Sequence, residues 1–334
     1  MFMDTILILT ICIVIFALAF DFINGFHDTA NAIATSVSTR ALTPRQAIIL
    51  AAAMNFIGAL TFTGVAKTIT KDIVDPFALE NGPLIILASL TSAIAWNLIT
   101  WYYGIPSSSS HAIIGSVAGA AISAAGVGIL NYGGFLKILQ SLILSPFLAL
   151  GVGFIIMSIF RFIFKNANLY STTRGFRMFQ IVTAAFQAYT HGTNDAQKAM
   201  GIITMALIAG GYHATTDIPE WVRISAALAM GLGTAVGGWK IIKTVGGKIM
   251  KIRPINGAAA DLSSALVILS ATMFHLPVST THVISSAIMG VGAAQRVKGV
   301  KWGVARRIVL TWIITLPVSA LIAGFVYQVL RLFF

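Results

Sequence analysis

The chain has 334 residues, of which 57% are hydrophobic and only 10% are charged. Soluble domains carry about 25% charged residues, so this composition excludes a soluble enzyme or binding module and predicts an all-α integral membrane protein. The formal net charge of +12 does not indicate nucleic acid, and no nucleic-acid partner is expected, because the cations gather in blocks between apolar runs.

Seven apolar runs follow one another along the chain, and each approaches or exceeds the roughly 20 residues that a helix needs to cross a bilayer. They cover residues 3–20, 44–66, 83–103, 135–164, 222–242, 256–274 and 304–330. The first run lacks the basic flank and the small-residue cleavage site of a signal peptide, so we expect it to remain as a helix. The runs predict a multi-pass protein embedded in a lipid bilayer, with the cell membrane as its location.

Basic residues cluster at 161–177, 240–253 and 296–307, between the apolar runs. Short loops rich in Lys and Arg usually face the cytoplasm, so these linkers are predicted to be cytoplasmic. The acidic loop residues lie elsewhere, and we place them on the outside. They are Asp72, Asp75, Glu80, Asp217 and Glu220.

A few charged residues remain at membrane depth once the basic and acidic loops are set aside. They are Asp21, Asp28, Asp195, Lys198 and Asp261. A charge near the bilayer centre costs roughly 2.5–3.5 kcal/mol on insertion scales, so it usually marks a pathway, a relay or a buried pair. We expect function from Asp28 and Asp195. For Asp21 and Asp261, an interfacial or helix-capping carboxylate is an equally good interpretation.

The sequence contains an internal repeat. The segment "NGFHDTANAIA" (24–34) aligns with "HGTNDAQKAMG" (191–201), and the segment "GIPSSSSHAIIG" (104–115) aligns with "HLPVSTTHVISS" (275–286). Two motif pairs in the same order indicate a duplicated chain. The predicted organisation is a first repeat, a basic cytoplasmic linker and a second repeat, at 1–165, 166–177 and 178–334.

Charge indicates that the two repeats cross the membrane in opposite directions. After the first motif the chain enters a basic turn with Arg40 and Arg45, whereas after Asp195 it enters an acidic stretch with Asp217 and Glu220. Inverted repeats of this kind are typical of secondary transporters, whose binding sites lie at the midplane on broken helices.

The first motif pair predicts such broken helices, since Gly and small polar residues interrupt apolar sequence there. Asp28 would then begin a new helix and, together with backbone carbonyls and Asn31, could coordinate a hard cation. The second repeat has Lys198 at the position of Asn31. Its ammonium could pair with Asp195, attract an anion or take the place of one cation.

The second motif pair predicts two helix starts, each with a Pro in its first turn and hydroxyls that face a cavity. Two opposed helix N-termini would enclose one tetrahedral oxyanion, and the small-residue stretch 112–129 suits a re-entrant hairpin. Hydroxyls that only bond across helices or to the preceding turn are the alternative, and the repetition makes it less attractive.

The histidines favour transport over catalysis. We expect His111 and His282 to orient the hairpins by hydrogen bonding rather than to hold a metal, and His27, beside Asp28, is the candidate proton relay. An intramembrane hydrolase is not expected, because no strained G-x-S-x-G nucleophile motif is present and every candidate residue is duplicated. No catalytic residue and no cofactor are therefore assigned.

The four motifs "NGFHDTANAIAT", "HGTNDAQKAMG", "IPSSSSHAIIG" and "LPVSTTHVISS" resemble the duplicated signatures of the inorganic phosphate transporter (PiT) family over nearly the whole chain. The resemblance implies a cation-coupled phosphate symporter with two inverted repeats, re-entrant hairpins, about twelve membrane segments and a homodimeric assembly. The implied cation-binding residues are Asp28, Asn31, Asp195 and Asn194, with Asp28 and Asp195 as sodium ligands if sodium is the coupling ion. The implied phosphate-binding residues are Ser108, Ser109, Ser110, Ser279, Thr280 and Thr281.

Two residues depart from the eukaryotic pattern of that family, which has Asn where this chain has His27 and Lys198. Both resemble the prokaryotic branch, so a charge relay or anion attraction is assigned to them, and the co-transported cation is sodium or a proton. Sulfate or a metal–phosphate complex is the alternative cargo. A passive anion channel is the alternative of another class, although the rings of basic residues that would line its pore are absent from the sequence.

Overall fold

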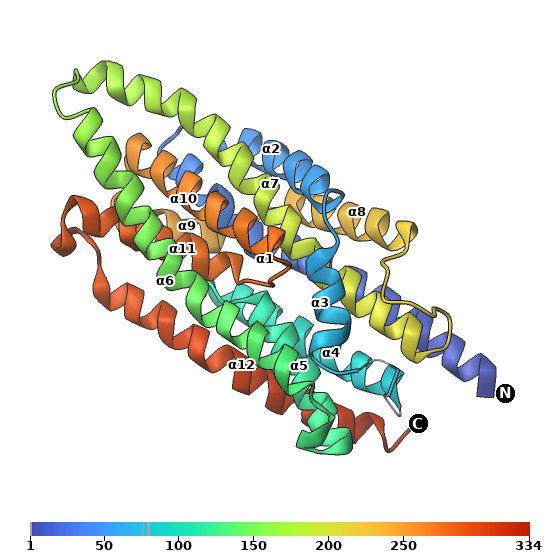
Figure 1. Cartoon of the computed structure of the whole chain (residues 1–334). Helices are drawn as coiled ribbons and strands as arrows, with labels where there is room; N and C mark the ends of the chain where they lie inside the picture. Colours follow the sequence, from blue (N-terminus) through green and yellow to red (C-terminus); the bar gives the residue numbers. More distant parts are fainter. Residues whose placement is uncertain (1, 76, 79–80) are drawn as a thin grey trace.

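The structure is a computed structural model that describes residues 2–75, 77–78 and 81–334 (Figure 1). Within these residues every regular element is a helix, apart from one isolated bridge between Val74 and Leu130, as the composition predicts. Glu80, one of the acidic loop residues, lies outside the described part. The helices of the first half are α1 (Phe2–Ser38), α2 (Pro44–Ala59), α3 (Gly64–Asp72), α4 (Gly82–Tyr103), α5 (Ser109–Ala125), the 3₁₀ turn η1 (Val127–Ile129) and α6 (Tyr132–Ile163).

The second half repeats this order of elements. Its helices are α7 (Leu169–Ala209), α8 (Glu220–Val236), α9 (Trp239–Gly247), α10 (Pro254–Met273), α11 (Thr280–Gln295), the 3₁₀ turn η2 (Val297–Gly299) and α12 (Trp302–Leu330). Each half thus has one long helix, two shorter helices in sequence, a fourth long helix, a helix of 16 or 17 residues and a last long helix. The motif pairs found in the sequence fall on corresponding elements, α1 with α7 and α5 with α11.

Five of the described helices are long and apolar enough to cross a membrane: α1 from Ile6 onward, α4, α6, α10 and α12. The pair α2 and α3 and the pair α8 and α9 pass the same test together but are sharply bent, the first by 67°. Counting each bent pair as one span gives seven, in the places of the seven apolar runs. By length and composition the described helices therefore provide five to seven spans, fewer than the expected twelve segments.

The two halves interlock rather than forming separate lobes (Figure 1). Helix α1 packs on α8 and α9, and α7 packs in the corresponding way on α2 and α3. Likewise α5 packs on α12 and α6 on α11. One buried core cluster contains residues of both halves, from Leu9 to Tyr327. Each half thus completes the core of the other.

Helices α1 and α7 run unbroken through their motifs, so the expectation of broken helices at Asp28 and Asp195 is wrong. The glycines have another role there. A side chain at Gly25 would collide with the backbone of Met230 in α8, and one at Gly192 with the backbone of Asn55 in α2. Glycine therefore lets neighbouring helices approach closely, as small residues do in membrane helix packing, and the helix need not unwind.

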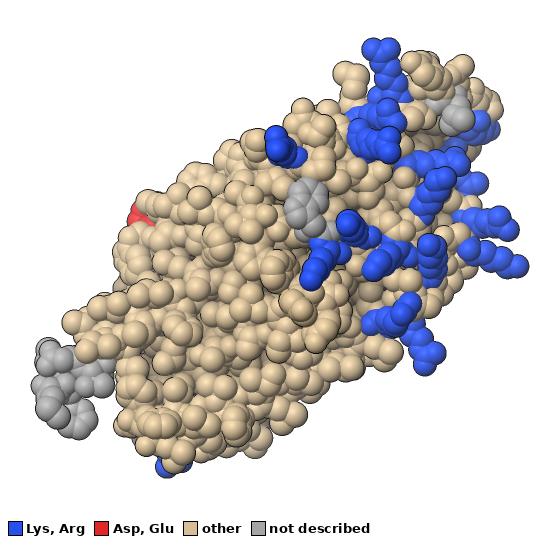
Figure 2. All heavy atoms as spheres, turned by 180° about the vertical axis from the view of Figure 1, so that it is seen from behind, with Lys and Arg blue, Asp and Glu red and all other residues tan. Residues whose placement is uncertain are grey.

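The surface shows both the apolar belt and the separation of charge that a membrane protein needs. Large apolar side chains of the outer helices are exposed, for example Phe147 on α6 and Leu321 on α12. In Figure 2 most of the visible Lys and Arg side chains lie toward one end, and the opposite half of that face shows almost none. The apolar faces thus suit contact with lipid.

Candidate functional site

The second motif pair forms two helix starts, as the sequence predicts. Ser108 caps α5, its hydroxyl accepting a hydrogen bond from the His111 amide at 3.1 Å, and Ser279 caps α11 in the same way from the His282 amide at 3.2 Å. The prolines are not in the first helical turn, contrary to expectation. Pro106 lies two residues before its cap, in the extended segment that leads into the helix. The hydroxyl caps alone define where each helix begins.

These two helix starts meet inside the protein. The His111 and His282 rings lie 4.4 Å apart between centroids, and His282 also stacks on Trp312 of α12 at 4.0 Å. Ser110 on α5 donates to the backbone oxygen of Val278, just before α11, at 2.7 Å. The two histidine rings therefore pack where the two helix starts meet.

Asp28, in the middle of α1, contacts both helix starts at once. Its Oδ2 accepts a hydrogen bond from Ser109 at 2.5 Å, and its Oδ1 accepts one from Thr281 at 3.0 Å. His27 Nδ1 lies 2.6 Å from the same Oδ1. On its other side the His27 ring contacts Thr100 of α4 at 3.1 Å. Asp28 is therefore the point at which the two repeated motifs converge.

Asp195, in the middle of α7, has the corresponding place in the second half. Its Oδ2 accepts hydrogen bonds from Thr280 at 3.1 Å and from Asn24 at 3.3 Å, and His191 Nε2 lies 3.3 Å away. Lys198 Nζ forms an ion pair with its Oδ1 at 2.7 Å. Asn24 and His191 are equivalent positions of the repeat, and both contact this one carboxylate.

Lys198 connects the two carboxylates. Besides its ion pair with Asp195, its ammonium donates to Ser109 Oγ at 3.2 Å, and Ser109 in turn donates to Asp28. All four side chains are at most 1% exposed. The site is thus a closed, continuous network in which one cation and one hydroxyl join two carboxylates.

The two asparagines assigned to the cation site differ in their surroundings. Asn31 donates to Thr281 Oγ1 at 2.9 Å, while its own Oδ1 is buried and has no hydrogen-bond partner among the described residues. Asn194 instead binds the segment before α11: its Oδ1 accepts from the Val278 amide, and its amide group donates to Thr272 and to the Leu276 oxygen. Asn31 therefore faces the carboxylate network, whereas Asn194 fastens a loop.

The hydroxyls assigned to phosphate divide into two groups. Ser108 and Ser279 cap their helices, and Ser110 binds a backbone oxygen. Ser109, Thr280 and Thr281 donate to the two carboxylates. The helix starts therefore face the carboxylates directly, and the site is closed to solvent on all sides.

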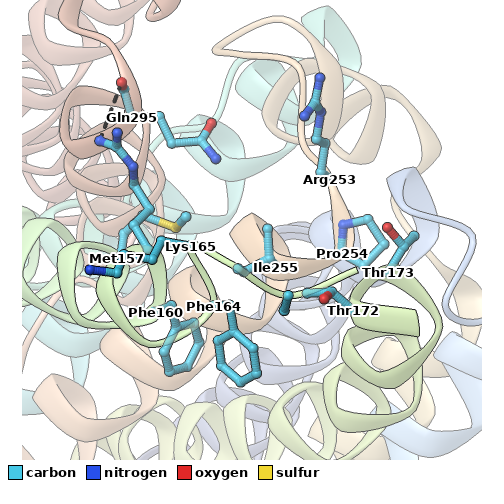
Figure 3. A pocket seen from close by; sticks show the side chains of 12 residues that line it. Met157, Phe160, Phe164, Lys165, Thr172, Thr173, Arg253, Pro254, Ile255 and Gln295 are labelled. Atoms are coloured by element: carbon cyan, nitrogen blue, oxygen red, sulfur yellow. Dashed lines mark hydrogen bonds between the residues drawn. The ribbon is translucent and has the colours of Figure 1, made fainter. Parts of the chain in front are cut away.

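An open hollow of about 380 Å³ lies elsewhere, between the end of α6 and the starts of α7 and α10 (Figure 3). Phe160 and Phe164 form one side of it, and Arg253 lies on the other. It contains none of the residues of the carboxylate network. This hollow is therefore separate from the buried site.

Asp21 and Asp261 are neither interfacial nor helix caps, so both of those interpretations are wrong. Asp261 lies inside α10, where Thr35 of α1 donates to it at 2.6 Å and Thr183 of α7 at 3.4 Å. Asp21 is fully buried in α1, and neither of its carboxylate oxygens accepts a hydrogen bond from a described residue. On α1, residues 21, 24, 28, 31 and 35 follow helical spacing, so they form one buried polar stripe through the site.

Asn24 and His191 were not assigned by sequence reasoning, although both stand in the quoted motifs. The signal that could have found them is their spacing: each lies four residues before an aspartate, which places it on the same helix face. This spacing is informative only if the helix is continuous, and we expected the helix to break at these motifs.

Comparison with known proteins identifies the family of this protein. The model of the phosphate transporter family matches residues 24–323, which include both motif pairs. The chain belongs to this family. Its members transport solutes and are not enzymes, and phosphate is the substrate of the family. The residues described above are thus the buried polar centre of a multi-pass phosphate transporter family member.

Similar proteins agree along the whole length. The chain is 70% identical to a protein of Bacillus subtilis named "Probable low-affinity inorganic phosphate transporter", over 99% of this chain and 100% of that one. A Rhizobium meliloti protein of the same name is 44% identical over 93% of both chains. A solved structure titled "The sodium-dependent phosphate transporter" superimposes with a TM-score of 0.88 and 28% identity, covering 99% of this chain and 100% of that one.

Proposed function

We propose that this transporter imports inorganic phosphate by symport with a small cation, sodium or a proton, through alternating access. The observation that carries the proposal is the contact between Asp28 and both helix starts, through Ser109 and Thr281. A carboxylate held against two helix N-termini links a cation-binding group directly to an anion-binding one. The solved relative is titled as sodium-dependent, which supports sodium.

Coupling follows from electrostatics in a closed site. A phosphate dianion that enters between the helix starts meets Asp28 and Asp195 in a medium of low dielectric, where like charges repel strongly. A cation on the carboxylates removes that repulsion, so each ligand strengthens binding of the other. If the cation is a proton, His27 is positioned to pass it to Asp28, because its ring bridges Asp28 and Thr100.

In this proposal the helix starts supply the phosphate donors. Ser109, Thr280 and Thr281 turn from the carboxylates to the phosphate oxygens, and the free amides at the starts of α5 and α11 add donors at the positive ends of two helix dipoles. Ser108 and Ser279 keep their capping bonds and Ser110 its bond to the backbone, so they hold the helix starts in place.

The proposed architecture is a pair of inverted repeats, 1–165 and 178–334, joined by the linker 166–177. The repeated element order and the reciprocal packing of α1 on α8 and α7 on α2 support it. The gathering of Lys and Arg at one end supports cytoplasmic linkers in the cell membrane, by the preference of basic loops for the cytoplasm. Re-entrant hairpins at α5 and α11, about twelve membrane segments and a homodimer are also part of the proposal.

The test is uptake of labelled phosphate into proteoliposomes, with inward sodium and proton gradients imposed separately. We expect accumulation above the outside concentration with one of the two gradients. Equilibration without accumulation would instead show a passive anion channel and refute the symport proposal. Excess unlabelled sulfate, and phosphate with and without a divalent metal, distinguish phosphate from the alternative cargoes.

A further inference from the structure

The ion pair of Lys198 with Asp195 breaks the symmetry of the duplicated site. Lys198 holds the position that Asn31 has in the first half, and it is fully buried. A buried ammonium is tolerated only beside a counter-charge. Here the counter-charge is Asp195, whose Oδ1 lies 2.7 Å from Lys198 Nζ, and the ammonium also donates to Ser109 Oγ at 3.2 Å. The second carboxylate therefore already has a cation, supplied by the chain itself.

The first carboxylate is different. Asp28 has two hydroxyl donors and the His27 ring, and no Lys or Arg side chain forms an ion pair with it in the described part of the chain. One turn further along α1, the amide nitrogen of Asn31 donates to Thr281. The Oδ1 atom of the same side chain is buried and has no hydrogen-bond partner among the described residues. Carboxylate, hydroxyl and amide oxygens are the ligands that a small hard cation prefers.

The groups around Asp195 are held by the chain itself. Asn194, the other asparagine of the motif, has both ends of its amide occupied by the segment before α11. The Oδ2 atom of Asp195 already accepts from Thr280 and Asn24 and contacts His191. Its other oxygen, Oδ1, is the one bound by Lys198.

We propose that Lys198 is a tethered cation that takes the place of one co-transported ion. Each cycle then moves a single cation at Asp28, one fewer than the same site would move with Asn at position 198. This inference rests on the proposed cation symport and specifies its stoichiometry. It also gives a role to the one position at which the two motifs differ in charge, Asn31 in the first half and Lys198 in the second.

The test is a measurement of coupling stoichiometry in proteoliposomes that contain the wild type or Lys198→Asn. At each of several phosphate gradients, the cation gradient is varied until net phosphate flux is zero. The slope of the logarithm of the phosphate concentration ratio against the logarithm of the cation concentration ratio then gives the number of cations moved per phosphate. We expect the slope of Lys198→Asn to exceed that of the wild type by one, because Asn supplies the oxygen that Asn31 supplies in the first half. Equal slopes in two coupled proteins would overturn the inference.

A second variant and a second readout guard against misfolding. In Asn31→Lys both carboxylates have an ammonium, so phosphate should raise the melting temperature of the detergent-purified protein equally with and without the coupling cation. In the wild type that thermal shift should require the cation. If Asn31→Lys still requires it, Lys198 does not act as a tethered cation.

The two proposals fail in different ways. If the wild type itself shows no cation-driven accumulation, the symport proposal is wrong. If the wild type is coupled while Lys198→Asn keeps the same slope, only the tethered cation is wrong. Lys198→Met is the matched control, since it removes the charge without adding an oxygen, and it should weaken phosphate binding without raising the number of cations.

Discussion

Replacing Gly25 by Ala tests the unbroken path of α1 past the site. An added methyl carbon would lie 2.5 Å from the Met230 oxygen, 2.7 Å from the Thr234 nitrogen and 2.9 Å from the Gly233 carbonyl carbon of α8. These are backbone atoms, which cannot rotate away as the end of a side chain can. Ordinary contact begins near 3.4 Å, so the two helices would have to separate by about 1 Å. Overpacking of this kind costs about 1–3 kcal/mol.

The assay is thermal unfolding of the purified protein in detergent, with Gly151→Ala as the matched control. Gly151 lies in α6 with no atom within 4 Å of an added methyl group, so Ala should gain about 0.5–1 kcal/mol from its better helix propensity. We expect Gly25→Ala to melt below the wild type and Gly151→Ala to melt at or above it. If the two variants melt alike, α1 and α8 are not in backbone contact and the helix unwinds at Gly25.

Three further predictions concern the carboxylates of Asp28, Asp261 and Asp217. Asp28→Asn should reduce phosphate accumulation to the level of protein-free vesicles while the melting curve stays cooperative, and normal uptake would refute the role of this carboxylate. Thr35→Val should lower the free energy of unfolding by about 1–3 kcal/mol, because it removes the 2.6 Å hydrogen bond to buried Asp261, and an unchanged melting temperature would contradict this. In the exposed loop before α8, the hydrogen bond from Lys67 lowers the pKa of Asp217, so that group favours the folded state above its unfolded pKa and loses this effect as pH falls through the folded value. Asp217→Asn should therefore melt slightly below the wild type at pH 7 and together with it in strong acid, and a gap that persists in acid would refute the pairing.

The sequence was sufficient to predict the elements that repeat. Asp28 and Asp195 were recognised as equivalents because charge at membrane depth is rare and each stands in the same short motif. The helix starts at Ser108 and Ser279 were predictable because a hydroxyl cap acts within its own turn. Both kinds of information are local, so one chain is enough to read them.

What the sequence could not provide is information about distant neighbours. Gly25 and Gly192 look like helix breakers until α8 and α2 are seen packed against them. The role of Lys198 was left among three alternatives, since spacing along α7 does not show that Ser109 of α5 also reaches the ammonium. The unused oxygen of Asn31 could likewise be found only from the full set of contacts.

The contacts of the carboxylates also determine which bonds must break if the site is to open. Asp28 and Asp195 lie on α1 and α7, and the hydroxyls that bind them, Ser109, Thr280 and Thr281, begin α5 and α11. Because α5 packs on α12 and α11 on α6, each helix start is supported mainly by the opposite half of the sequence. If either half of the chain rocked as a rigid unit, the packing of α5 on α12 and of α11 on α6 would be lost. The proposed cycle therefore requires movement between the carboxylate-bearing helices and the helix starts, and phosphate, by taking over the three hydroxyls, would loosen the very contacts that hold them together.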